Sequence, residues 1–331
     1  MKTMRKMIIS VIILLIFGCQ STKKNYNPVV EKNDAHPLLE PITTSGLYHD
    51  LREHTNFSYA KFNSFVISED ETLIVFSAKI DSEYFHLYQK HPYGKSFTQI
   101  TTGKSNNLWP SISYDKKKVA FISDRDGSPN VYIVELDKTF LIAQITDDRT
   151  EKFLPKFSPD GTQILYTVKE NEKFTMIVID LNTKIKTFLG EGIGFSWAQN
   201  NRILFMKPKE TQTNAIWTIE PAKLNVSQVV SDHQKFIVFP SSNSAGEIFC
   251  YSKTRQPLKF ETFFKGTFPS VSELWISIIN ERKRAEYQIM NDGYTNFNPI
   301  ISGERLYFIS DRNNGENLWS VKIALDIKKN P

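Results

Sequence analysis

The most apolar stretches of this chain are short and show no alternation with polar residues. Five of them contain three or four successive apolar residues, at positions 119–122, 164–166, 203–206, 248–251 and 306–309. A half-buried strand alternates between apolar and polar residues, whereas a strand covered on both faces is apolar throughout. We therefore predict a buried β-strand at each of these positions.

Each apolar run belongs to a longer unit that recurs along the chain. A polar turn precedes the run, and one or two further short strands follow it. The equivalent anchors of six copies, spaced by 45, 45, 39, 46 and 59 residues, are Ser68, Ser113, Ser158, Trp197, Asn243 and Ser302. A period near 45 with four short strands per unit is typical of a β-propeller blade, and a helical solenoid would show a 3.6-residue periodicity instead. The sequence thus predicts an all-β, six-bladed propeller of four-stranded blades.

A closed ring requires the two ends of the chain to share a blade. The last copy supplies strands through residues 321–323 but no clear fourth strand, while residues 38–44 resemble the fourth-strand ends at 99–102 and 144–147. We expect residues 38–44 to be the N-terminal strand that pairs with the C-terminal blade. Pro41 would then lie on an outermost strand, where proline is tolerated.

Three copies carry motifs of a known family. Residues 157–161 read FSPDG, residues 121–127 read FISDRDG before NVY at 130–132, and residues 308–312 read FISDR before NLW at 317–319. These motifs resemble the WD-like repeat of TolB-type six-bladed propellers, and the resemblance covers residues 38–325. It implies a protein that binds a partner at the channel mouth and uses no cofactor. TolB itself carries an α/β domain before its propeller, for which we see no room here.

The first residues resemble a bacterial lipoprotein signal. Lys2, Arg5 and Lys6 precede an apolar region of eleven residues at 7–17, which is too short to span a bilayer, and Gly18-Cys19 follows. The lipobox consensus prefers Leu where this chain has Ile16. We expect a signal peptide at residues 1–18, acylation of Cys19, a flexible tether at 19–37 and the propeller at 38–331. An uncleaved signal anchor with an incidental cysteine is the alternative.

Charge and cysteine content narrow the classes of partner. The formal charge of +5 falls to +2 once residues 1–18 are removed, which leaves no electrostatic case for nucleic-acid binding. The lipoprotein resemblance, with Gln20 after the cysteine, implies an outer-membrane protein that faces the periplasm in a Gram-negative cell. Cys250 would then have no disulfide partner, and its apolar surroundings indicate a small buried hydrophobe.

Candidate binding residues lie where the second-to-third-strand loops and the linkers between blades share one rim. Arginine and aromatic residues are favoured at binding hot spots. The candidates on this rim are Trp109, Asp124, Arg125, Phe153, Phe297, Asp311 and Arg312. The alternative is a purely structural role, in which the Asp-Arg pairs form turns with solvated charges. Asp124 and Asp126 also suggest calcium, but a full set of ligands is missing, so we expect no metal.

Three further segments have alternative interpretations. The fifth copy holds about 14 extra residues within 254–273, whose phenylalanines at 260, 263, 264 and 268 could dock a partner or fold back over the blade. The cluster from His49 to His54 lacks the spacing of a zinc motif and is predicted to be a solvated loop. Residues 194–198 (GFSWA) mimic a nucleophile elbow, but we expect a strand there, with no helix after it.

The sequence therefore favours a monomeric, membrane-anchored periplasmic scaffold that binds an envelope protein or a cell-wall polymer and catalyses no reaction. The alternative is a glycan or peptide hydrolase with carboxylates inside the channel. Few acidic residues occur on the first strands that would line that channel.

Overall fold

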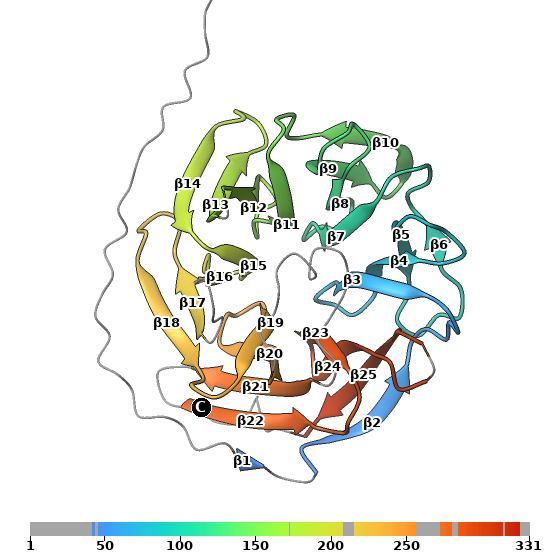
Figure 1. Cartoon of the computed structure of the whole chain (residues 1–331), viewed down its shortest axis with the longest axis vertical. Coiled ribbons are helices and arrows are strands. Elements are labelled where there is room, and N and C mark those ends of the chain that lie inside the picture. Colours follow the sequence, from blue (N-terminus) through green and yellow to red (C-terminus); the bar gives the residue numbers. More distant parts are fainter. Residues whose placement is uncertain are drawn as a thin grey trace, which may run out of the picture.

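The continuous apolar runs of the sequence form the second strands of their sheets, and both faces of these strands are buried. In the last copy, Leu306, Tyr307, Phe308 and Ile309 all have no exposed surface. The structure is a computed structural model that describes residues 42–43, 46–171, 173–207, 215–255, 272–279, 284–313 and 315–324. Within these ranges the chain forms six sheets arranged as blades around a ring (Figure 1). The all-β, six-bladed prediction is confirmed.

The strands of each blade follow the chain from the centre of the ring outward. Blade 1 contains β3 (Lys61–Ile67), β4 (Ile74–Lys79), β5 (His86–Lys90) and β6 (Thr98–Gln99). Blade 2 contains β7 (Asn107–Ile112), β8 (Lys118–Ser123), β9 (Asn130–Glu135) and β10 (Lys138–Gln144). Blade 3 contains β11 (Glu151–Phe157), β12 (Gln163–Glu170), β13 (Lys173–Asp180) and β14 (Lys186–Glu191).

The other half of the ring has the same order with two additions from the N-terminal end. Blade 4 contains β15 (Ile193–Trp197), β16 (Ile203–Met206), β17 (Ala215–Ile219) and β18 (Val226–Ser231). Blade 5 contains β19 (Phe236–Ser242), β20 (Ile248–Thr254), β21 (Glu273–Ile279), β22 (Arg284–Met290) and, at its edge, β1 (Ile42–Thr43). Blade 6 contains β23 (Asn296–Ser302), β24 (Arg305–Ser310), β25 (Asn317–Ile323) and β2 (Tyr48–Glu53).

An N-terminal strand does close the ring, but it lies later in the chain than residues 38–44. β2 pairs antiparallel with β25, with Tyr48 opposite Ile323 and Glu53 opposite Trp319. Within the predicted segment, β1 instead pairs parallel with β22 of blade 5 (Figure 1). The expectation of a solvated loop from His49 to His54 was therefore wrong, because most of that segment is the closing strand.

Polar contacts of two buried residues, Arg305 and His54, fix the closing strand. The guanidinium of Arg305, on β24, reaches across β25 and forms an ion pair of 2.8 Å with Asp50 on β2. His54 follows β2 and is 8% exposed; one ring nitrogen lies 2.8 Å from the Pro92 carbonyl and the other 2.7 Å from Ser320 Oγ. Because a carbonyl oxygen only accepts, Nδ1 of His54 carries the proton and Nε2 accepts from Ser320.

Polar turns between the first and second strands repeat one hydrogen-bonding unit. In blades 1 to 3 the turn serine donates to the aspartate two residues later and accepts from the backbone N–H five residues later. The serines concerned are Ser68, Ser113 and Ser158. This unit explains the FSPDG motif, because its serine and aspartate close the tight turn between the first and second strands.

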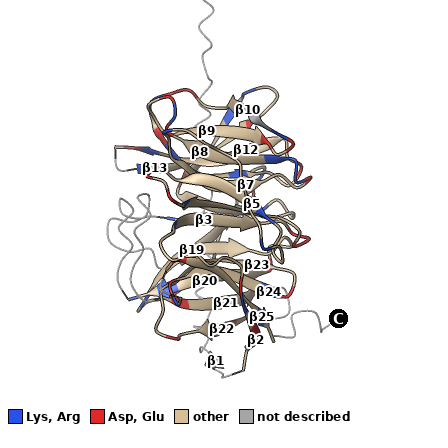
Figure 2. Cartoon of the chain, turned by 90° about the vertical axis from the view of Figure 1, so that its right-hand side faces the viewer, with Lys and Arg blue, Asp and Glu red and all other residues tan. Residues whose placement is uncertain are grey.

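Two opposite faces follow from this order. We define the first-turn face as the one that carries the turns between first and second strands, and the linker face as the one with the second-to-third-strand loops and the linkers between blades. Figure 2 shows that charged residues lie mainly in loops and at strand ends. No helix long and apolar enough to cross a membrane occurs among the residues described.

Candidate functional site: the central channel and the linker face

The first strands of all six blades surround a central cavity of about 570 Å³. Its walls come from β3, β7, β11, β15, β19 and β23, and its mouth from first-turn residues such as Glu69, Asn243, Ser244, Glu247 and Gly303. None of the described residues that line it belongs to a linker between blades. The cavity therefore opens on the first-turn face, opposite the rim on which the sequence placed the candidate binding residues.

A bulge in each first strand sets which side chains face this cavity. The register of all six first strands shifts midway, and in four of them the residue at the bulge precedes a proline. These four residues have φ near +52°, a value that side-chain-bearing residues rarely adopt, and they are Trp109, Leu154, Phe239 and Asn298. The bulge turns the strand, so that the residue two positions further on lines the cavity.

Equivalent positions of the six blades form one ring inside the cavity. The turn hydrogen bond Ala198 N to Arg202 O matches Ser158 N to Gln163 O, so Ala198 rather than Trp197 is the fourth anchor. The residue two positions before each anchor then lines the cavity in every blade. We call these residues the channel ring: Val66, Ser111, Lys156, Ser196, Ser241 and Ile300. Blades 2 to 5 contribute three hydroxyls and one ammonium, and the adjoining blades 1 and 6 contribute two aliphatic side chains.

Among the described residues, Lys156 is the one cation that lines this cavity. Within the described ranges, no hydrogen bond or ion pair to its ammonium is found. Burial lowers the pKa of Lys156 to about 8, which leaves it mainly protonated at pH 7. The carboxylates of the cavity, Glu69 and Glu247, belong to the mouth, and Glu69 already accepts a hydrogen bond of 2.8 Å from Gln199. Lys156 thus faces the cavity as an unpaired positive charge.

The Asp-Arg pairs predicted as rim candidates stabilise individual blades on the linker face. Arg312 donates from Nε to Ser310 Oγ at 3.0 Å and from a terminal nitrogen to Asn296 Oδ1 at 2.9 Å. Asp311 accepts from the backbone N–H of Thr295 at 2.9 Å. The side chain of Arg312 is only 9% exposed and also pairs with Asp292. The loop is thereby tied to the linker that enters the same blade.

Blade 2 repeats this clamp residue for residue. Arg125 donates to Ser123 Oγ at 3.1 Å and to Asn107 Oδ1 at 2.8 Å, while Asp124 accepts from Asn106. The guanidinium also lies over the Tyr132 ring, 4.9 Å from its centroid. The same residues in the same roles in two blades are characteristic of blade architecture. A direct contact of these pairs with a partner stays a prediction.

The aromatic rim candidates lie in the core. Trp109, Phe153 and Phe297 are 4%, 4% and 2% exposed, and the rings of Trp109 and Phe153 meet edge to face with centroids 5.6 Å apart. They belong to one apolar cluster that includes first-strand residues of all six blades. Their side chains therefore pack between blades, and a part in binding stays a prediction that would require them to become exposed.

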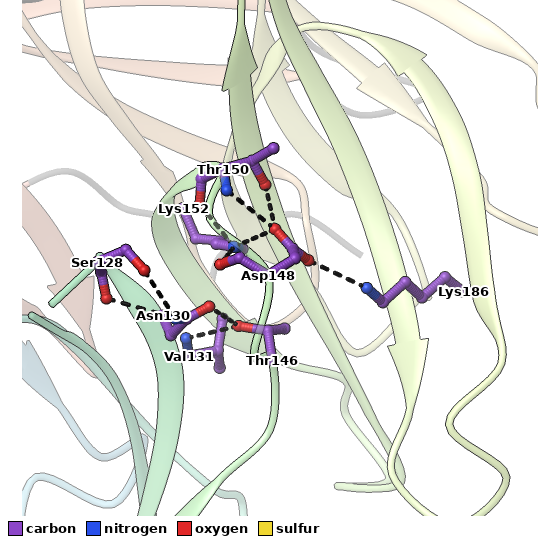
Figure 3. A network of polar contacts seen from close by, with 8 residues as sticks. All are labelled: Ser128, Asn130, Val131, Thr146, Asp148, Thr150, Lys152 and Lys186. Carbon is purple, nitrogen blue, oxygen red and sulfur yellow. Dashed lines mark hydrogen bonds and ion pairs between the residues drawn. The ribbon is translucent and has the colours of Figure 1, made fainter. Parts of the chain in front are cut away.

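A buried ammonium organises the linker between blades 2 and 3 (Figure 3). The Lys152 side chain has no exposed surface, and its Nζ donates to the Asp148 carboxylate, the Asp148 carbonyl and the Thr150 carbonyl. Burial raises the pKa of Asp148, but the hydrogen bonds from Lys152 and Thr150 outweigh it and hold that pKa below its ordinary value. Lys186 adds a second, longer ion pair of 3.4 Å to the same carboxylate.

Several other candidates have clear structural places. Cys250 has no exposed surface, and burial raises the pKa of its thiol to about 12, so it is a buried hydrophobe as expected. Residues 194–197 lie in strand β15. The insertion at 254–273 falls outside the described residues except at its two ends, and Cys19 with the whole tether also lies outside them. No group of three or more metal-ligating side chains occurs in the described ranges.

Comparison with known proteins settles the family. The family model described as the TolB beta propeller domain matches residues 51–244. The chain belongs to the TolB beta-propeller family. In this TolB-family propeller the matched range runs from the closing strand β2 to the first turn of blade 5 and so includes Lys156.

Individual relatives are distant. The tricorn protease homolog of Saccharolobus solfataricus is 26% identical over 227 residues, which cover 66% of this chain but only 20% of that protein. The structure of putative TolB from Agrobacterium tumefaciens is 14% identical, with a TM-score of 0.57 over 81% of this chain and 91% of that one. An oligogalacturonate lyase in complex with manganese is 13% identical, with a TM-score of 0.54 over 84% and 92%. At such low sequence identity, the structural similarity shows a shared fold and nothing more.

Sequence reasoning missed Lys156 as a site residue. Its signal was present, because Lys156 follows Pro155 at the place where other copies have Ser111, Ser241 and Ile300. The comparison of copies emphasised what they share, whereas a binding function in a repeat protein resides in what one copy has alone.

Proposed function

We propose that this chain is a membrane-anchored scaffold of the periplasm that binds an envelope protein or a cell-wall polymer through its linker face and catalyses no reaction. The proposal rests on two tyrosines of adjoining linkers. Tyr59, between β2 and β3, is 94% exposed, and Tyr294, between β22 and β23, is 44% exposed. Tyrosine is enriched at binding hot spots because it offers a large contact area at a small entropic cost.

Hydrogen bonds order the linkers that carry these tyrosines. The Asn317 side chain accepts from Phe57 N at 2.8 Å and donates to Phe57 O at 3.0 Å, two residues before Tyr59. Asp311 accepts from Thr295, and the Arg312 guanidinium lies 5.4 Å from the centroid of the Tyr294 ring. The predicted Asp-Arg pair therefore supports an exposed aromatic residue. A surface ordered before binding loses little entropy on binding.

Affinity capture tests the linker face. The acylated protein is recovered from envelope extracts as wild type and as Tyr59→Ala/Tyr294→Ala, and the recovered partners are quantified. We expect the yield of recovered partner to be at least ten-fold lower with the double variant than with the wild type. Tyr114→Ala is the matched control, because Tyr114 is 64% exposed on the first-turn face. Full yield with the double variant, or equal loss with the control, would contradict the proposal.

The membrane anchor is tested separately through Cys19. We propose that an acyl chain on Cys19 holds the protein at the outer membrane, where each buried methylene contributes about 0.8 kcal/mol. A Cys19→Ala variant should leave the membrane fraction and incorporate no labelled palmitate. Retention of that variant in the membrane fraction would refute the anchor.

A hydrolase is the second candidate, because Glu69 and Glu247 both line the mouth of the cavity. Paired carboxylates are the usual machinery of glycan hydrolysis. A screen of envelope glycans and peptides with the wild type and with Glu69→Gln/Glu247→Gln decides the matter. Turnover by the wild type that the double variant lacks would replace the scaffold proposal with an enzyme.

A further inference from the structure

The channel ring has one polar side and one apolar side. Ser111, Lys156, Ser196 and Ser241 come from blades 2 to 5, whereas Val66 and Ile300 come from blades 1 and 6, which adjoin. We propose that the central cavity binds a small organic carboxylate, whose anionic end pairs with Lys156 and whose apolar part rests against Val66 and Ile300. This inference is independent of the linker-face partner, because the cavity opens on the opposite face.

The polar side of the ring offers an ammonium and three serine hydroxyls as hydrogen-bond donors, of which the Ser196 hydroxyl lies 3.0 Å from that of Ser242. The Lys156 ammonium has no partner within the described ranges, and an ammonium that is withdrawn from solvent without a partner is costly. Ser111 Oγ accepts from the backbone N–H of Phe157 at 3.2 Å, which leaves its hydroxyl proton free to donate. No hydrogen bond engages the Ser241 hydroxyl among the residues described. A carboxylate can accept from several such donors at once.

The charges that line the cavity disfavour a ligand with more than one negative charge. Lys156 is the one cation among the described residues that line the cavity, so it can neutralise one carboxylate but not a phosphate dianion. Glu69 and Glu247 at the mouth repel multiply charged anions. A ligand with one carboxylate and no other charge therefore fits best.

The size and the remaining walls of the cavity favour a small ligand with an aliphatic part. A volume of about 570 Å³ lies within the range usual for small-molecule sites. Beyond the ring, Ile67, Ile112, Phe157, Phe195 and Ile301 also line the cavity. Toward the linker face the apolar cluster that contains Trp109, Leu154 and Phe239 lies between the blades. A short fatty acid matches both halves of such a site.

Binding of hexanoate and of hexanamide tests the proposal, because the two probes share shape but differ in charge. Titrations of the purified protein are followed by ligand-observed NMR. We expect hexanoate to bind at least ten-fold more tightly than hexanamide, and Lys156→Met to weaken hexanoate binding about ten-fold or more. Lys138→Met is the matched control, because Lys138 lies on the outer strand β10 with a side chain 54% exposed, and it should bind hexanoate like the wild type.

A second measurement separates pairing from a general structural effect. The pKa of Lys156, followed by NMR of its side chain, should rise by about one unit when hexanoate is bound, because a neighbouring carboxylate stabilises the ammonium. Lys156→Met should melt no lower than the wild type, since it removes an unpaired charge. Equal binding of acid and amide, wild-type affinity of Lys156→Met for hexanoate, an unchanged pKa, or no hexanoate binding at all would overturn the proposal.

Discussion

The guanidinium of Arg312 donates to Asn296 Oδ1 at 2.9 Å, and so joins the second-to-third-strand loop of blade 6 to the first residue of its innermost strand. Arg125 and Asn107 form the same contact at 2.8 Å in blade 2. A residue pair that sequence reasoning assigned to a binding rim thus stabilises the blade itself. Its effect on a partner would be indirect, through the linkers that it orders.

Loss of either arginine should destabilise the fold. Arg312→Ala removes hydrogen bonds of a charged group to Ser310 and Asn296, and we expect the free energy of unfolding to fall by about 2 kcal/mol. Arg312→Lys should recover little, because a single ammonium cannot replace the planar guanidinium. Urea denaturation measures the effect. Arg149→Ala, at an exposed linker position, is the control, and an equal loss there would contradict the clamp.

The buried ammonium of Lys152 should contribute more to the free energy of unfolding than Arg312 does. Lys152→Met leaves the partly buried carboxylate of Asp148 without its main partner, and we expect a loss of about 3 kcal/mol or more. Lys186→Met removes only a longer, part-exposed ion pair to the same carboxylate, for which the expected loss is below about 1 kcal/mol. Thermal and urea unfolding of both variants give the comparison. Similar losses of stability in Lys152→Met and Lys186→Met would show that the burial of Lys152 does not increase its contribution.

Stability should fall as the pH drops from about 6.5 to about 4 because of His54. Burial lowers the pKa of His54 to about 4, so in this interval the unfolded chain binds a proton that the folded chain does not. The folded state therefore loses up to about 3 kcal/mol relative to the unfolded state, with no further loss from His54 below pH 4. A His54→Gln variant should lack this component of the pH profile. Superimposable profiles of wild type and variant would contradict it.

The ring should depend on β2 and not on the segment before it. A chain without residues 1–44 keeps the closing strand and should have a free energy of unfolding within about 1 kcal/mol of that of the full chain, because β1 contributes only two residues to blade 5. A chain without residues 1–54 leaves the edge of β25 open and Arg305 without Asp50, and we expect it to lose several kcal/mol. Denaturation of both truncated chains decides the matter; equal stability would place the closure elsewhere.

The local sequence pattern was sufficient to predict the blades but not the strand that closes the ring. The apolar runs at 119–122 and 306–309 predicted buried strands, because burial on both faces requires apolar residues at every position. The closing strand β2 reads YHDLRE, and all its residues from His49 onward are exposed. An outer edge strand with little apolar surface has no distinctive pattern. The Ile-Thr resemblance of residues 38–44 was therefore a misleading signal.

For the candidate site, too, the local sequence predicted the fold but not the residues that meet in the cavity. Repeated motifs such as Ser-Asp-Arg revealed the fold, and for that reason they were poor indicators of binding. Lys156 became meaningful only when the turn hydrogen bonds aligned the six blades and placed it in one ring with Ser111 and Ser241.

By itself, the sequence determined the number of blades, their strands and their tight turns, because each depends on residues close together in the chain. Only the tertiary structure decided which strand closes the ring, which arginines are buried and which side chains meet in the central cavity. Those features bring together residues from opposite ends of the chain and from six separate repeats. Contacts of that kind arise when the ring forms, and no local pattern encodes them.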